Sequence, residues 1–371
     1  MNPSAATGLR RHAGPGPAGS NPASGNRSPA GHMVLLPALV LLTAGLGAPV
    51  AAAHTASISP NAASRSFHTT RAAQAVISVP CNEGALVNAI NTANSTPTTP
   101  DTLNLAPRCI YILTTNHGSG VDGLPGITSP ITINGRGATI TRASSAPEFR
   151  ILFVAPNGGL TLNKTTISNG KTGAGGGGIQ NNGGTLAVRD STIRNNTAEF
   201  GGGIDNRGTL TVRDTTIRNN TASNTINSGR GGGIFDSTLS PVTVTASIIR
   251  NNTADEAGGG IYHNFGTIAL TSSTIDHNTA SRGGGFWNSG GSTASVRASA
   301  IRNNTANSNG GAVFNNGGTI NFRLSAVQHN TAVGDGGGIY NNTGTVTPLR
   351  STIRNNTPNN CAGTPVPGCS G

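Results

Sequence analysis

The sequence predicts a parallel β-helix, an all-β solenoid in which successive turns of the chain stack on one another. A segment of the form Ile-x-x-Asn-Thr, with Val once in place of Ile, recurs seven times at steps of 24, 32, 26, 26, 26 and 26 residues. A period of this length is typical of solenoids. A run of glycines followed by a bulky apolar residue recurs at a similar interval. The apolar residues of the first segment are Ile193, Ile217, Ile249, Ile275, Ile301, Val327 and Ile353.

Each repeat divides into three strand-like pieces. In one repeat the glycine run ends at Ile204, the second piece alternates around Leu210 and Val212, and the third surrounds Ile217. Alternation with a period of two is typical of a β-strand with one buried side. Three short strands and three bends make one turn of a parallel β-helix, in which like residues stack about 4.8 Å apart. Loop length varies mostly at the bend before the glycine run, and the longest insertion covers residues 223–230.

Asparagine occupies one fixed position in all seven repeats. Its side chain tolerates the left-handed backbone of a bend, and its amide group both donates and accepts hydrogen bonds. We therefore expect a structural ladder along the axis rather than glycosylation sites. Its members are Asn196, Asn220, Asn252, Asn278, Asn304, Asn330 and Asn356.

The first 53 residues differ from the repeats. Residues 1–32 carry three arginines, an apolar run fills residues 33–50, and three alanines follow. This order is typical of a cleaved secretory signal, and a retained membrane anchor is the alternative. We expect a disordered linker over residues 54–80, an N-terminal cap and first coils over 81–130, the repeats over 131–358 and a C-terminal disulfide tail over 359–371.

Four cysteines flank the repeats in two local pairs. In an oxidising compartment their spacing favours the disulfides Cys81–Cys109 and Cys361–Cys369. A short amphipathic helix is expected between the first two cysteines, where it would cover the exposed end of the solenoid. Its apolar face consists of Leu86, Ala89, Ile90 and Ala93.

The glycine-run and Ile-x-x-Asn pieces resemble the paired repeats of chlamydial polymorphic outer-membrane proteins, whose motifs are Gly-Gly-Ala-Ile and Phe-x-x-Asn. Residues 310–313, Gly-Gly-Ala-Val, are the nearest match, whereas Ile stands here where that family has Phe. Residues 81–94 resemble the Cys-Ser-Leu-Arg-Glu-Ala-type cap of secreted bacterial β-helix proteins. The resemblance covers roughly residues 81–371. It implies a single-stranded, right-handed helix in a secreted or surface protein, and many members of such families are adhesins. At this repeat length we expect about eight to ten coils.

Arginine dominates the charge of this chain. The formal net charge is +11, and lysine occurs only at Lys164 and Lys171. Such a charge favours an anionic partner. Arginine follows the third-piece apolar residue in five of seven repeats, which predicts an outward column able to hold an anionic polymer. The alternative is a solvated face. The column consists of Arg194, Arg218, Arg250, Arg302 and Arg354. Arg189, Arg213, Arg297 and Arg323 form a second, partial column.

Two aromatic residues are candidates for sugar binding. Tyr262 and Trp287 each follow a core residue in adjacent coils, so we expect them to face outward. Rings in this arrangement suit stacking on a sugar.

A catalytic alternative depends on Asp190 and Asp214, which share a position in adjacent coils and could form a carboxylate pair of the glycosidase type. Each follows an arginine, so a surface Arg–Asp ladder explains them equally well. We expect no cofactor and no metal site, since no cysteine or histidine pattern indicates one.

The sequence therefore favours an exported surface or secreted protein that binds glycan or cell-envelope polymer without catalysis. The alternatives are a polysaccharide lyase or glycoside hydrolase and a purely structural spacer. We expect neither nucleic acid as a partner nor stable membrane insertion. The sequence indicates no oligomeric state.

Overall fold

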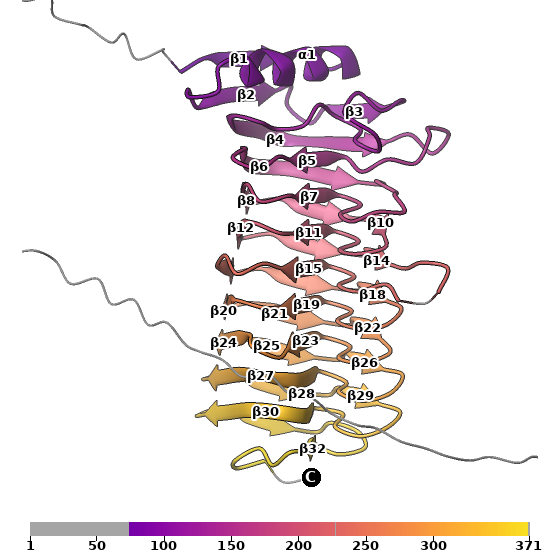
Figure 1. The fold of residues 1–371 in the computed structure, drawn as a ribbon, viewed down its shortest axis with the longest axis vertical. Coiled ribbons are helices and arrows are strands. Elements are labelled where there is room, and N and C mark those ends of the chain that lie inside the picture. Colours follow the sequence, from indigo (N-terminus) through magenta and orange to yellow (C-terminus); the bar gives the residue numbers. More distant parts are fainter. Residues whose placement is uncertain (1–73, 227, 370–371) are drawn as a thin grey trace, which may run out of the picture. The chain divides into compact units, whose positions relative to one another are not determined.

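The structure is a computed structural model that describes residues 74–226 and 228–369. This part of the chain is a right-handed parallel β-helix of about 11 turns, confirming the predicted fold (Figure 1). The turns beyond the expected eight to ten lie at the N-terminal end, where β1 (Val76–Val79) stacks on β2 (Asp101–Leu105). β1 lies within the segment expected to be a linker; it orders because Val79 is buried in the first turn. The signal predicted at residues 1–53 lies outside the described residues.

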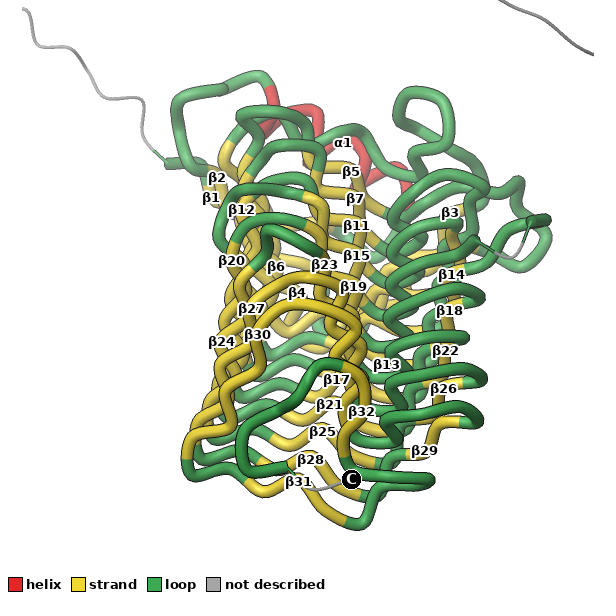
Figure 2. Tube along the Cα trace, turned by 60° about the horizontal axis from the view of Figure 1, so that its bottom comes forward, coloured by secondary structure: helices red, strands yellow, loops and turns green. Residues whose placement is uncertain are grey.

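The strands stack in four parallel columns along the axis (Figure 2). The first column, after the glycine run, contains β5 (Leu152–Val154), β7 (Ile179–Asn181), β11 (Ile204–Asn206), β15 (Ile234–Ser237), β19 (Ile261–Asn264), β23 (Phe286–Ser289), the first halves of β27 (Val313–Arg323) and β30 (Ile339–Leu349), and β32 (Cys361–Gly363). The second contains β1, β2, the first parts of β4 (Pro130–Arg142) and β6 (Gly159–Ser168), β8 (Thr185–Arg189), β12 (Thr209–Arg213), β16 (Val242–Thr245), β20 (Thr267–Thr271), β24 (Thr293–Arg297) and the second halves of β27 and β30.

The third column contains β3 (Ile110–Leu113), the second parts of β4 and β6, β9 (Thr192–Arg194), β13 (Thr216–Arg218), β17 (Ile248–Arg250), β21 (Thr274–Asp276), β25 (Ala300–Arg302), β28 (Ala326–Gln328) and β31 (Thr352–Arg354). A fourth column, absent from our three-piece reading of the repeat, is built from two-residue Thr-Ala strands that turn the alanine inward. These strands are β10 (Thr197–Ala198), β14 (Thr221–Ala222), β18 (Thr253–Ala254), β22 (Thr279–Ala280), β26 (Thr305–Ala306) and β29 (Thr331–Ala332).

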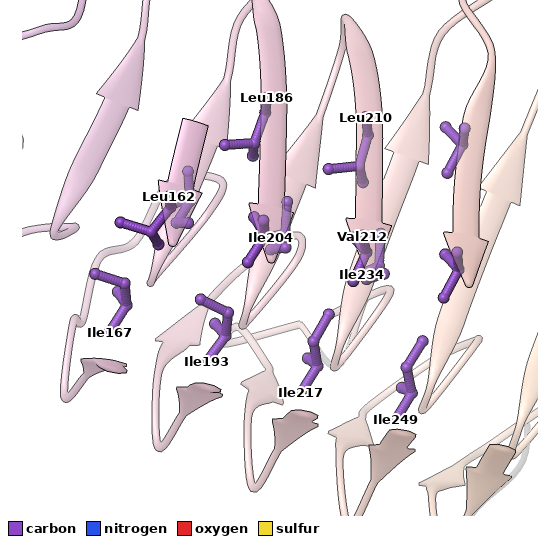
Figure 3. Packing of buried hydrophobic residues seen from close by; sticks show 14 of the residues in the cluster. Leu162, Ile167, Leu186, Ile193, Ile204, Leu210, Val212, Ile217, Ile234 and Ile249 are labelled. Carbon is purple, nitrogen blue, oxygen red and sulfur yellow. The ribbon is translucent and has the colours of Figure 1, made fainter. Parts of the chain in front are cut away.

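The core is a set of aliphatic columns inside the solenoid. Unshifted parallel pairing places Ile204 on Ile234 and Ile217 on Ile249, and their side chains point into the same interior (Figure 3). Leu210 and its neighbours in this interior are fully buried. Full burial of one such side chain stabilises the fold by about 1.5–3 kcal/mol. The repeat therefore converts a narrow interior into one continuous core.

The asparagine ladder predicted from the repeat is present. Asn220 Nδ2 donates to Asn252 Oδ1 at 3.0 Å, and the main-chain N–H of Asn220 donates to the same oxygen at 3.0 Å. The same pair of bonds runs from Asn196 through to Asn356, which donates to Asn360 Oδ1 at 3.0 Å. The ladder satisfies polar groups that the bend buries.

Both ends of the solenoid are covered. Helix α1 (Glu83–Asn94) begins after Asn82, whose side chain accepts from the Ala85 N–H at 2.8 Å, as an N-cap should. Its buried residues are the four predicted ones, Leu86, Ala89, Ile90 and Ala93. The disulfides Cys81–Cys109 and Cys361–Cys369 both form as predicted, one at each end of the repeats.

Candidate functional site

The arginine column follows the outer face of the third strand column. Parallel pairing places Arg194 on Arg218, Arg218 on Arg250, and Arg302 between Asp276 and Gln328. Within the described residues Arg194, Arg218, Arg250 and Arg354 take part in no ion pair. These four guanidinium groups are therefore available to an anionic ligand.

Asp276 divides the arginine column into two parts. Its carboxylate lies 3.5 Å from Arg302 Nε and accepts from Asn303 Nδ2 at 2.9 Å. His277 Nδ1 lies 2.9 Å from its other oxygen. Arg302 is thus engaged within the protein, unlike the other members of the column.

Asp190 and Asp214 do lie at equivalent corners of successive turns, each with a φ of 49°. Both are exposed, and Asp214 accepts from Arg213 Nε at 2.9 Å. Neither carboxylate lies in an enclosed, water-poor cleft of the kind that catalytic carboxylates occupy. The geometry matches the surface Arg–Asp alternative better than a glycosidase pair.

Tyr262 and Trp287 belong to a stack of aromatic rings on the outside of the first strand column. Their ring centroids lie 5.8 Å apart with planes at 8°, and Phe235 and Phe314 continue the stack on either side at 5.2 and 4.4 Å. Tyr262 is only 7% exposed and Trp287 only 5%. The ring faces are therefore covered by neighbouring rings and not open to a sugar. Sequence inspection could have found this stack, because an aromatic residue follows the first-column apolar residue in five consecutive coils, at Phe235, Tyr262, Trp287, Phe314 and Tyr340.

An ionic clamp lies over the aromatic stack. Glu256 accepts from Arg230 Nε at 2.6 Å and from Arg282 Nη2 at 2.9 Å. The Arg282 guanidinium lies 5.1 Å from the Trp287 ring centroid, and that of Arg230 lies 5.6 Å from the Tyr262 centroid. Such cation–π contacts stabilise the stack and shield it from water.

A buried polar network occupies the first-column positions before the aromatic stack begins. Arg150 Nε contacts Asp122 at 2.7 Å, Gln180 Nε2 donates to Asp205 at 2.9 Å, and Arg207 lies 3.3 Å from Asp205. Burial raises the pKa of Asp205, although Arg207 opposes this. Burial likewise raises the pKa of Asp122 and lowers that of Arg150. Asp205 is fully buried, so the network lies closed within the wall rather than open to a substrate.

A second polar ladder lies inside the bend after the first strand column, and our sequence analysis missed it. Its hydrogen bonds run from Asn181 to Asn206 and from Asn206 to Asp236, each at 2.8 Å. His263 Nδ1 lies 2.7 Å from the other Asp236 oxygen. Burial raises the pKa of Asp236, while His263 and Asn206 lower it. The ladder is sealed from solvent, and the remaining members, each bonded to the next, are Asn288, Asn315 and Asn341.

The described residues contain one further surface feature of interest, a hollow of about 420 Å³ at the corner between the second and third strand columns. It lies on β2, β4, β6 and the turn after β8. Its lining is polar and basic, and consists of Asn104, Asn134, Arg136, Asn163, Lys164 and Asp190. Sequence analysis assigned no role to five of these six residues.

The fold and its side-chain columns define a right-handed parallel β-helix solenoid stabilised by disulfides, which are typical of oxidising compartments. Searches with this chain found no matching family model, no matching curated protein and no matching solved structure. Within residues 74–226 and 228–369 no helix is long and apolar enough to cross a bilayer. The same residues contain no group of three or more His, Cys, Asp or Glu side chains that could hold a metal.

Proposed function

We propose that this chain is an exported surface or secreted β-helix protein that binds glycan or cell-envelope polymer without catalysis. The observation that supports this most is the arginine column, because Arg194, Arg218 and Arg250 repeat once per turn on one face with no acidic partner. A linear anionic polymer also repeats along its length, so it can engage several guanidinium groups at once.

The destination outside the cell is supported by two features. Residues 33–50 carry the apolar run of a secretory signal, and both cysteine pairs are oxidised. The likeness of the repeats to those of polymorphic outer-membrane proteins adds an adhesin-like role at the surface. The exposed Asp190 and Asp214 give no comparable support to catalysis.

The binding test measures affinity of the full chain for acidic and neutral polysaccharides. We expect an acidic polysaccharide to bind, and its affinity to fall as salt screens exposed charges. The triple variant Arg194→Gln/Arg218→Gln/Arg250→Gln should bind about tenfold more weakly or worse, since charge-assisted hydrogen bonds contribute about 1.5–3 kcal/mol each.

The matched control removes three exposed arginines from the partial second column, Arg189→Gln/Arg297→Gln/Arg323→Gln. An equal loss in both triple variants would show only a general charge effect and would reject the column as the site. Failure to bind any polymer would leave the structural spacer. Shortened or unsaturated products in the reaction mixture would establish an enzyme instead.

A further inference from the structure

The corner hollow on β2, β4 and β6 has a floor of stacked amides. Asn104, Asn134 and Asn163 are paired in register on the outer side of these strands. Asn134 Nδ2 donates to Asn104 Oδ1 at 3.1 Å, and Asn163 Nδ2 donates to Asn134 Oδ1 at 3.1 Å. Each amide nitrogen has two hydrogens and uses one within the row. The second N–H of each asparagine is therefore free for a ligand, at one donor per turn.

Two cations stand over this floor. Arg136 and Lys164 are exposed, and neither takes part in an ion pair within the described part of the chain. Both have a left-handed backbone, with φ of 54° and 47°, which fixes them at the corner itself. Arg108 continues the same corner one turn earlier, where its N–H donates to the Arg136 carbonyl at 3.3 Å.

The corner is enlarged in this part of the solenoid. Asn134 pairs with Asn163 and Ala138 pairs with Thr165, so β4 has three residues where β6 has only Lys164. Gly135 permits this bulge, because a Cβ there would lie 2.6 Å from the Lys164 carbonyl oxygen. The extra residues carry Arg136 outward and form a wall of the hollow. In the regular repeats the corner is a single residue, such as Asp190 or Asp214.

We propose that this hollow is a binding site for an acidic glycan, separate from the arginine column, with carboxylates of the sugar chain on Arg136 and Lys164 and its hydroxyl groups on the amide floor. The inference rests on the proposed function in that the chain must meet glycans. Asparagine amides suit hydroxyl groups because they both donate and accept. The lining contains no aromatic ring on which a nucleobase could stack, which favours a sugar chain over a single-stranded nucleic acid.

The probe is a set of short oligogalacturonates, with their fully methyl-esterified forms as the neutral match, titrated into the purified full chain by calorimetry. We expect the acidic form to bind and the ester to bind at least tenfold more weakly. Arg136→Gln/Lys164→Gln should weaken binding of the acidic form at least tenfold. Arg297→Gln/Arg323→Gln, which removes the same charge from a distant part of the solenoid, should leave it unchanged.

A gain-of-affinity variant guards against a folding artefact. Asp190 is the only carboxylate lining the hollow, and asparagine tolerates its left-handed backbone. Asp190→Asn should therefore tighten binding of the acidic oligomer several-fold and leave binding of the ester unchanged.

Three results would overturn the inference while leaving the proposed function intact: equal binding of acid and ester, full affinity in Arg136→Gln/Lys164→Gln, or no gain in Asp190→Asn. Preference for single-stranded DNA over the oligogalacturonate would also reject it. If the chain binds no glycan of any kind, the proposed function fails together with this site.

Discussion

Each asparagine of the first ladder bonds to three different parts of the neighbouring coils. Asn252 Oδ1 accepts from the main-chain N–H and the side-chain amide of Asn220. Its Nδ2 donates to the Ile217 carbonyl and to Asn278 Oδ1, both at 3.0 Å. All these groups are buried, so none can turn to water when its partner is lost.

Replacing Asn252 by alanine should lower the free energy of unfolding by about 3 kcal/mol or more, because each buried donor left without a partner costs about 1–3 kcal/mol. Urea or thermal denaturation measures this. The control is Asn251→Gly, at the exposed neighbouring position with φ 53°, where glycine keeps the backbone conformation. Equal stability of the two variants would mean that the ladder does not stabilise the fold.

The glycine run illustrates how an element is limited by its neighbours. The middle glycine, Gly259 in one coil, has no unusual backbone angle, but its turn lies directly against the adjacent coil. A Cβ at this position would lie 2.5 Å from the Gly284 carbonyl oxygen. The close approach permits the main-chain hydrogen bond from Gly259 to Gly283, at 3.3 Å, that joins the two turns.

We expect Gly259→Ala to destabilise the protein by about 1–3 kcal/mol, the usual cost of overpacking. Gly173→Ala is the matched control, since a Cβ there meets nothing within 4 Å. The difference in midpoint temperature between the two variants is the measurement. A drop in both would point to glycine composition in general rather than to close stacking.

At the level of elements, the sequence predicted what repeats without exception and missed what repeats with substitutions. The first ladder was found because asparagine is invariant in seven repeats. The second was missed because Asp236 and His263 interrupt its asparagines. Tyr262 and Trp287 were expected to be open because their strand position is external, but their burial depends on neighbouring rings and on Arg282 from a bend of variable length.

The corner hollow could not be predicted for a different reason. It lies before the recognised repeats, and it depends on a three-residue bulge in β4 that pairs with a single residue in β6. Such a local change in register has no periodic signal. Only the packed coordinates place Arg136 and Lys164 over the same row of amides.

On the scale of the whole molecule, each coil contacts only the coil before it and the coil after it, so unfolding should begin at an uncovered end. Cys81 and Cys109 are 28 residues apart and hold the N-terminal cap closed. A loop of that size corresponds to about 3–4 kcal/mol in the chain-entropy description.

The variant Cys81→Ser/Cys109→Ser should therefore exchange amide hydrogens faster in β1, β2 and β4, while β20 and β24 keep their protection. Hydrogen exchange followed by mass spectrometry resolves these regions. Cys361→Ser/Cys369→Ser should show the opposite pattern, with faster exchange in β30 and β32. Uniform loss of protection along the chain in either variant would show that the solenoid unfolds as one unit.

The unshifted pairing of one coil on the next also sets how such a chain can lengthen or shorten. From Ile249 to Ile353 the repeat step is constant at 26 residues, and each column continues through every turn. Removing or duplicating 26 residues between equivalent positions rejoins all four strand columns and the first ladder, whereas any other number breaks them together. Evolution by recombination between repeats is thus restricted to whole turns, and the reach of the molecule changes in increments of about 4.8 Å.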